Sequence, residues 1–135
     1  MMLKKITIES EINNLRIVEN AIDTMTNESG INQENYGKIL ISTLEAVNNA
    51  IVHGNKSDRN KHVHIELLIE KNMLRVTVED EGPGFKPESV PDPTKPENIE
   101  LLNGRGVFLM KKLADKIEFN NKGNSVTMIF KNIKP

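Results

Sequence analysis

Cysteine and tryptophan are absent from this chain of 135 residues. Without cysteine the protein can form neither a disulfide bond nor a thiolate metal site. Aromatic residues make up only 4% of the sequence, so a stacking platform for nucleic-acid bases is not expected. The formal net charge is −1, which argues against a broad electrostatic contact with nucleic acid or with anionic lipid.

Long apolar runs are absent as well. No segment has the length of a signal peptide or of a membrane span, and we therefore expect a cytoplasmic protein. Hydrophobic residues at 37% and charged residues at 27% are typical of a globular chain. The length predicts a single domain, residues 1–135, that is large enough to bury a core.

Hydrophobic periodicity predicts the order β-α-α-β-β-loop-α-β-β. Strands are expected at 3–8, 62–69 and 73–80, and a final hairpin at 117–121 and 125–131. The first helix should begin after Ser10 as its N-cap and end at Gly30, the second should run from about Asn32 to Gly54, and the third should follow Gly106. Residues 86–103 hold four prolines and little periodicity, which is typical of a lid or a linker. This order predicts an α+β fold with one sheet and its helices on one face.

The second expected helix carries an unusual polar stripe. Its apolar positions should face the core, and they are Leu40, Leu44, Val47 and Ile51. Glu45, Asn49 and His53 follow one another at spacings of four on the opposite side. Such a stripe is usually a solvated face, but Glu45 is the only formally charged residue from 39 to 54, which favours a cleft. A carboxylate and an amide one turn apart can accept a proton and ligate Mg²⁺, although this spacing alone is common by chance.

Two glycine clusters flank the proline-rich segment. DEGPGF (80–85) places Asp80, Gly82 and Gly84 at the end of a strand, where a tight turn is the simplest interpretation. NGRG (103–106) precedes the third expected helix, whose first backbone N–H groups could bind phosphate. The glycine spacing fits neither a Walker P-loop nor a dinucleotide fingerprint. Taken together with the polar stripe, the two clusters indicate a nucleotide site.

These motifs resemble those of the GHKL superfamily of ATP-binding domains. EAVNNAIVHGN (45–55) is similar to its N-box, DEGPGF to its first glycine box and GRGVFLM (104–110) to its second. The similarity spans nearly the whole chain and is greatest to the anti-sigma-factor serine kinases of the RsbW and SpoIIAB type. It implies a Bergerat-type two-layer α/β sandwich, with a mixed, mostly antiparallel sheet, three main helices on one face and an ATP lid at about 86–103.

The resemblance also implies the roles of individual residues. Glu45 would be the general base on a partner serine, Asn49 would ligate Mg²⁺, and Asp80 would accept a hydrogen bond from the adenine amino group. Gly82 and Gly84 would hinge the lid and admit the adenine base. Gly104 and Gly106 would donate backbone N–H groups to the phosphates.

Two positions depart from the family pattern. Asn124 stands where the family often has a threonine in the adenine pocket, and its amide or the hydroxyl of Ser125 could substitute. Arg105 stands between the second-box glycines. It is equally compatible with a contact to the γ-phosphate and with a solvent-facing loop position.

Four other side chains allow a functional interpretation beside a simpler one. Arg16 lies near where such anti-sigma factors present an arginine to their partners, but a surface arginine needs no such role. His53 could take part in the site or only cap the helix. His62 and His64 share a strand face without an evident third ligand, so a metal site is not expected there.

Three functions are compatible with these features. The first is an ATP- and Mg²⁺-dependent serine/threonine kinase that acts as an anti-sigma factor, phosphorylating an anti-sigma-factor antagonist and sequestering a sigma factor. The alternative is a nucleotide-gated binding module of the same fold with little or no kinase activity. A detached histidine-kinase catalytic domain is least expected, because no helical dimerisation segment precedes residue 1. The resemblance also implies a homodimer, with no direct contact to nucleic acid or membrane.

Overall fold

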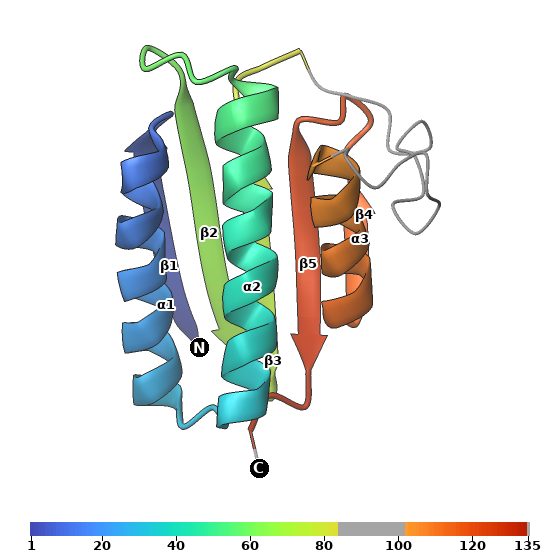
Figure 1. The fold of residues 1–135 in the computed structure, drawn as a ribbon. Helices are drawn as coiled ribbons and strands as arrows, with labels where there is room; N and C mark the ends of the chain where they lie inside the picture. The colour runs from blue at the N-terminus through green and yellow to red at the C-terminus, as the bar shows by residue number, and fades with distance from the viewer. Residues whose placement is uncertain (84–101, 135) are drawn as a thin grey trace.

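The computed structural model describes residues 1–83 and 102–134, and at 102–105 it describes the backbone alone. Gly84 and nearly all of the predicted lid therefore lie outside the described residues. Five strands form one sheet, and three main helices cover one of its faces (Figure 1). No described helix has the length and apolar character needed to cross a membrane.

The order of the elements follows the prediction. The strands are β1 (Met2–Glu9), β2 (His62–Glu70), β3 (Met73–Glu79), β4 (Lys116–Phe119) and β5 (Ser125–Lys131). The helices are α1 (Leu15–Ser29), α2 (Gln33–Asn49) and α3 (Leu102–Leu113). A 3₁₀ turn, η1 (Ile12–Asn14), precedes α1, and a π-helical turn, η2 (Ala50–Gly54), continues α2.

The sheet has the strand order β1-β2-β3-β5-β4. All four pairings among the described strands are antiparallel, so the predicted α+β sandwich is confirmed with an antiparallel sheet rather than a mixed one. The two helices between β1 and β2 form a hairpin that returns the chain in the opposite direction. β3 and β4 do run the same way, but β5 lies between them, and no parallel pair forms.

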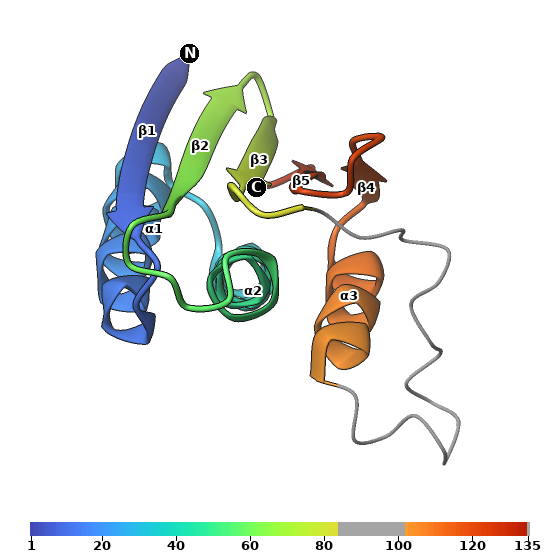
Figure 2. The ribbon, with the colours of Figure 1, turned by 90° about the horizontal axis from the view of Figure 1, so that it is seen from above.

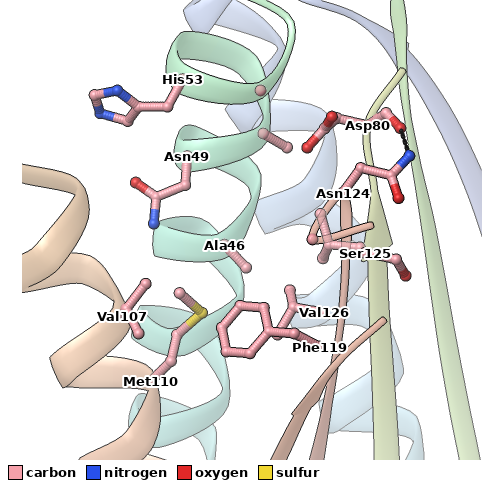
Figure 3. Close-up of a pocket in the computed structure, with 14 residues that line it drawn as sticks. Ala46, Asn49, His53, Asp80, Val107, Met110, Phe119, Asn124, Ser125 and Val126 are labelled. Atoms are coloured by element: carbon pink, nitrogen blue, oxygen red, sulfur yellow. Dashed lines mark hydrogen bonds between the residues drawn. The ribbon is translucent and has the colours of Figure 1, made fainter. Parts of the chain in front are cut away.

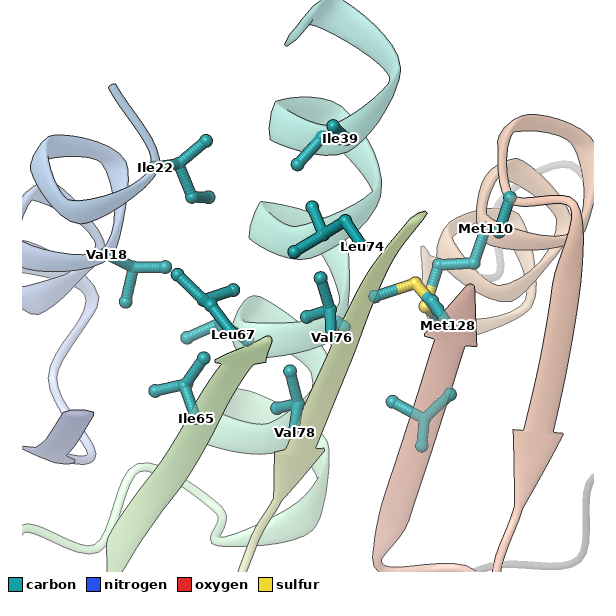
Figure 4. Packing of buried hydrophobic residues seen from close by; sticks show 14 of the residues in the cluster. Val18, Ile22, Ile39, Ile65, Leu67, Leu74, Val76, Val78, Met110 and Met128 are labelled. Carbon is teal, nitrogen blue, oxygen red and sulfur yellow. The ribbon is translucent and has the colours of Figure 1, made fainter. Parts of the chain in front are cut away.

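The core lies between the sheet and the helices (Figure 4). Alternate residues of the two central strands point toward the helices and are buried: Val63, Ile65, Leu67, Leu74, Val76 and Val78. Val18 and Ile22 of α1 and Ile39 of α2 meet them from the helical layer. Because each such side chain contributes about 1.5–3 kcal/mol when it leaves water, this layer fixes the helices on the sheet.

The buried face of α2 is broader than the predicted stripe. Val47 and Ile51 are buried as predicted, whereas Leu40 and Leu44 are only half-buried and Ile39 is fully buried. The physical reason is that α2 contacts α1 on one side and α3 on the other in addition to the sheet (Figure 2). A helix covered on three sides has no single apolar stripe.

The helix ends confirm two predictions and contradict one. Gly30 ends α1 with a left-handed φ of 68°, and Asn32 caps α2 by accepting a backbone N–H at 2.9 Å. The prediction that Ser10 caps the first helix is wrong, because a 3₁₀ turn intervenes. The Ser10 hydroxyl instead donates to the carbonyl oxygen of Lys61 at 2.6 Å.

The described part of α3 begins at Leu102, so the prediction of a start after Gly106 is also wrong. Glycine costs about 1 kcal/mol in a helix interior relative to alanine, which is why the local signal placed the helix start later. Contacts between α2 and α3 stabilise the turn that contains both glycines. Gly104 and Gly106 therefore lie within the helix, and the predicted lid, about 86–103, ends by Asn103 in helical backbone.

Candidate functional site

A cavity of about 300 Å³ lies between α2, α3 and the end of the sheet (Figure 3). One end of it is apolar and is formed by Ala46, Val107, Met110, Phe119 and Val126. Polar side chains gather at the other end, and they are Asn49, His53, Asp80 and Asn124. An apolar slot with a few convergent polar groups is typical of a site for a small organic ligand.

Asp80 lies directly after β3 and is only 8% exposed. Its Oδ1 accepts the Gly82 N–H at 2.8 Å, while Oδ2 accepts no hydrogen bond from the described residues. Burial raises the pKa of the Asp80 carboxyl; the Gly82 hydrogen bond opposes this, Glu79 adds to it, and Lys122 and Lys61 lower it. At the cavity wall, Asp80 is thus fixed through Oδ1, and Oδ2 has no partner among the described residues.

Two glycines allow the Asp80 carboxylate to approach the end of η2. A Cβ on Gly54 would lie 2.3 Å from Oδ2 of Asp80, and a Cβ on Gly82 would lie 1.9 Å from the carbonyl oxygen of Gly54. Sequence reasoning gave Gly54 only the role of ending a helix. Its position next to the polar stripe was the available signal, but the partner that requires a glycine there comes from a distant strand.

Glu45 and Asn49 both face Gly106 of α3. A Cβ on Gly106 would lie 2.9 Å from Nδ2 of Asn49 and 3.0 Å from Oε2 of Glu45, so the two side chains lie next to each other. Asn49 lines the cavity, whereas Glu45 lies one helical turn away and is not part of its lining. Glu45 and Asn49 are thus half-buried beside a neighbouring helix, whereas His53, the third residue of the polar stripe, is exposed.

The second glycine cluster lies in the first turns of α3. Counted from Leu102, Gly104 is the third residue and Gly106 the fifth. The first N–H groups of a helix have no internal partner and are suited to an anion, so the phosphate contacts of Gly104 and Gly106 stay predictions. Gly106 also admits Glu45 and Asn49 closely. The side chain of Arg105 lies outside the described residues.

Asn124 holds Asp80 in place through the backbone. Its Nδ2 donates to the Asp80 carbonyl oxygen at 3.0 Å, and its own carbonyl oxygen accepts the Asp80 N–H at 2.9 Å. Its Oδ1 accepts from Nδ2 of Asn120 at 2.7 Å. Asn124 and Ser125 both line the cavity, but the Asn124 amide is already engaged in fixing the strand ends.

The histidines divide between two places. His53 is exposed and lines the cavity rim. His62 and His64 do not line it; the backbone N–H of His62 donates to Glu81 at 2.7 Å and Nε2 of His64 lies 3.2 Å from the same carboxylate. These contacts lower the pKa of Glu81, and the hydrogen bond from the His62 N–H has the largest effect.

In residues 1–83 and 106–134, no group of three or more histidines and carboxylates could hold a metal ion. Arg16 is exposed on α1.

The raised pKa of Asp80 predicts how an Asp80→Asn variant behaves. The folded state holds the Asp80 proton more tightly than the unfolded state, whose carboxyl has an ordinary pKa of 3.8. The wild-type free energy of unfolding therefore falls as pH rises from that value through the folded-state pKa, and the loss persists at higher pH. Asparagine carries no charge. The Asp80→Asn variant should therefore have a higher free energy of unfolding than the wild type at neutral pH. At about pH 3, where the Asp80 carboxyl of the wild type is neutral, the two proteins should not differ in this way.

Urea denaturation at a series of pH values measures this difference. Glu70→Gln, which removes an exposed carboxylate on β2, is the matched control and should show no such pH-dependent gain. A gain for Asp80→Asn that is the same at all pH values would contradict the assignment of the effect to the buried charge.

Comparison with known proteins gives a consistent result. A profile of the histidine kinase-like ATPase domain matches residues 8–130. An anti-sigma F factor of Geobacillus stearothermophilus is 37% identical over 90 residues, covering 64% of this chain and 60% of that protein. One from Clostridium perfringens is 36% identical over 95 residues, covering 67% and 68%. The serine-protein kinase RsbW of Oceanobacillus iheyensis is 26% identical over 115 residues, covering 81% and 73%.

This chain spans about 60% of the length of the Geobacillus anti-sigma F factors that it matches. A crystal structure of the RsbU and RsbW domains of a Mycobacterium tuberculosis protein has a TM-score of 0.71 at 19% identity, covering 100% of this chain and 34% of that one, and shows the same fold. The resemblance to the GHKL superfamily is thus confirmed, with relatives named anti-sigma F factor and serine-protein kinase RsbW. The profile match runs from the last two residues of β1 to all but the last residue of β5, and this chain therefore belongs to the histidine kinase-like ATPase domain family.

Proposed function

We propose that this protein is an ATP- and Mg²⁺-dependent serine/threonine kinase that acts as an anti-sigma factor, phosphorylating an antagonist protein and sequestering a sigma factor. The observation that carries the proposal is the convergence of Asn49, Asp80 and Asn124 around one partly apolar cavity, with Glu45 beside Asn49. The names of the relatives, anti-sigma F factor and serine-protein kinase, support the partner-switching role.

Different walls of the cavity would contact the adenine ring, its amino group and the phosphates of a nucleotide. An adenine ring would pack among Met110, Phe119 and Val126, with its amino group donating to Oδ2 of Asp80. The phosphates would then lie toward Asn49 and the first turn of α3, where the N–H of Gly104 and the positive end of the helix favour negative charge.

The donor chemistry at α2 fits a magnesium ion. Asn49 offers a neutral amide oxygen, and Mg²⁺ prefers oxygen ligands while it keeps waters and phosphate oxygens as its other ligands. When bound, the ion would neutralise charge on the phosphates during transfer. Asn49 lies so close to Gly106 that a Cβ there would approach its Nδ2 to 2.9 Å, so Gly106 leaves room for the Asn49 amide.

Glu45 would act as the general base on the serine of the antagonist. The serine Oγ forms a bond to the γ-phosphorus while the bond from that phosphorus to the β,γ-bridging oxygen breaks, and ADP leaves. The hydroxyl proton moves to the Glu45 carboxylate. Because Glu45 lies beside Asn49 but outside the cavity lining, it can face a protein substrate that arrives from solvent.

Phosphate transfer in two variants tests the proposal. The antagonist is obtained by co-purification with the protein, and its labelling from γ-labelled ATP is followed with Mg²⁺ present. Glu45→Gln should slow labelling about 100-fold or more, since a general base typically contributes that factor, and should leave ATP affinity nearly unchanged. Asn49→Ala should lose both labelling and Mg²⁺-dependent affinity. Glu70→Gln is the control, and undiminished labelling by Glu45→Gln would exclude Glu45 as the base.

A nucleotide-gated binding module is the second candidate, favoured by the position of Glu45 outside the cavity lining. In that case the wild type would bind ATP and recover a sigma factor in a pull-down, and no phosphorylated antagonist would form. Light scattering of the purified protein tests the homodimer that belongs to the first proposal.

A further inference from the structure

The turn between β4 and β5 forms one wall of the nucleotide cavity. Gly123 and Asn124 of this turn line the cavity, and Gly123 has a left-handed φ of 80°. Asn120 begins the turn directly after β4, and its side chain is exposed and does not line the cavity. Sequence reasoning gave Asn120 no role, but its hydrogen bonds connect it to the site.

The side-chain oxygen of Asn120 fixes the backbone of the turn. Its Oδ1 accepts three backbone N–H groups, from Gly123 at 2.8 Å, from Asn124 at 3.0 Å and from Ser125 at 3.2 Å. The Asn120 N–H also donates to the Ser125 carbonyl oxygen at 3.0 Å. Asparagine commonly binds nearby backbone in this way, so these contacts alone indicate only a turn-forming residue.

The side-chain nitrogen of Asn120 makes a contact that the turn does not require. Its Nδ2 donates to Oδ1 of Asn124 at 2.7 Å. Because an amide nitrogen can only donate and an amide oxygen can only accept, this contact determines which way the Asn124 carboxamide points. Its Oδ1 lies toward Asn120, and its Nδ2 lies 3.0 Å from the carbonyl oxygen of Asp80 (Figure 3). Without the Asn120 donor, the Asn124 amide could turn over and lose its bond to Asp80.

Asn124 is in turn the partner of both backbone groups of Asp80. Its Nδ2 donates to the Asp80 carbonyl oxygen, and its own carbonyl oxygen accepts the Asp80 N–H at 2.9 Å. The regular pairing of β3 with β5 ends one residue earlier, at Glu79 and Ser125. Asn124 therefore holds the Asp80 backbone where the ladder stops, and the position of the Asp80 carboxylate depends on this contact.

We propose that Asn120 is a positioning residue for base recognition: acting through Asn124, it sets the place of the Asp80 carboxylate that accepts the amino group of a purine nucleotide. The inference rests on the proposed function, because it requires the base to lie in the cavity. An amino group donates to a carboxylate, whereas the oxo group of inosine triphosphate cannot. A displaced Asp80 should therefore reduce the preference for ATP over inosine triphosphate, since the phosphates of both nucleotides bind elsewhere.

Calorimetric titration of the full chain with ATP and with inosine triphosphate tests the proposal. Asn120→Asp keeps an acceptor for the three N–H groups but replaces the Nδ2 donor with an oxygen. The ratio of the two affinities should fall about tenfold, the range of one hydrogen bond. In an Asn124→Ala background the same substitution should change the ratio no further, because the link is already broken. Asn121→Asp, which adds the same charge at the exposed neighbour, is the matched control and should leave the ratio unchanged.

Hydrogen exchange of the Asp80 amide gives a second readout that needs no nucleotide. Asn120→Asp should raise the exchange rate of the Asp80 N–H about tenfold, while the Val76 N–H in the middle of β3 keeps its rate. Equal acceleration at both amides would overturn the proposal, because it would indicate general destabilisation.

The two readouts separate this inference from the proposed function. An unchanged affinity ratio in Asn120→Asp, when the wild type prefers ATP, would overturn the role of Asn120. If the wild type bound both nucleotides equally, the base assignment in the proposed function would fail. A raised Asp80 exchange rate would then still support the positioning of Asp80 by Asn120, and an unchanged rate would overturn it.

Discussion

Replacing Gly82 with alanine is expected to destabilise the fold by at least about 3 kcal/mol, the upper range for overpacking, and to abolish nucleotide binding. The new Cβ would lie 1.9 Å from the carbonyl oxygen of Gly54. The atom in its way belongs to the backbone, so the clash can be relieved only if η2 and the segment after β3 move apart. Asp80, whose Oδ1 accepts the Gly82 N–H, would be displaced with that segment.

Urea denaturation and calorimetric titration with ATP and Mg²⁺ measure the two effects. Gly37→Ala is the matched control, because Gly37 lies in α2 with no atom within 4 Å of an added Cβ. That substitution should raise the free energy of unfolding by about 0.5–1 kcal/mol and leave binding unchanged. A Gly82→Ala variant as stable as the wild type would show that the two segments are not packed as closely as described.

Asn55→Ala is the change with the second largest expected effect, a loss of about 3 kcal/mol in the free energy of unfolding. Asn55 is 1% exposed; its Nδ2 donates to Ser10 Oγ at 2.8 Å and to the His62 carbonyl at 3.0 Å, and its Oδ1 accepts the Glu81 N–H at 2.8 Å. Truncation removes the hydrogen-bond partner of the Glu81 N–H, one acceptor contact of the His62 carbonyl and one of the two hydrogen bonds of the Ser10 hydroxyl. Because Glu81 follows Asp80 directly, ATP affinity should also fall about tenfold, which corresponds to about 1.4 kcal/mol.

A double-mutant cycle with Ser10→Ala separates this network from general damage. Ser10 bonds both Asn55 and the Lys61 carbonyl, so the two substitutions should be clearly non-additive in stability. Asn60→Ala, in the exposed loop before β2, is the control and should change neither stability nor binding. Additive losses, or an unchanged ATP affinity in Asn55→Ala, would contradict the role of Asn55 in positioning Asp80.

The parts of the fold that were predicted correctly have local signals. The alternation of 62–69 and 73–80, the glycine stop at Gly30 and the start of the second helix near Asn32 each depend on residues only a few positions apart. The N-cap role of Ser10 and the start of α3 were predicted wrongly, because contacts with distant parts of the chain determine them. Ser10 is recruited by Lys61 and Asn55 from another part of the chain, and the glycine-containing turn of α3 is stabilised by α2.

The candidate site shows the same limit. Motifs indicated Asn49 and Asp80, and the quoted segments also contain Ala46, Val107 and Met110. No motif indicated Phe119 or Val126, because both have the pattern of ordinary strand residues. Gly54 was missed as the partner of Asp80, since only the folded sheet brings the two together. The roles of Glu45, Arg105, Gly84 and the lid in nucleotide chemistry stay predictions for the experiments above.

The position of β5 between β3 and β4 determines the stage of synthesis at which the protein can bind a ligand in the cavity. The cavity draws Ala46 and Asn49 from the middle of the chain and Asn124 to Val126 from near its end. During synthesis, β3 keeps a bare edge and the slot lacks a wall until residue 131 has left the ribosome, whichever helices have formed before. A nascent chain is therefore a poor nucleotide binder until β5 has been made, and truncation within the hairpin of β4 and β5 removes the ligand pocket together with part of the sheet.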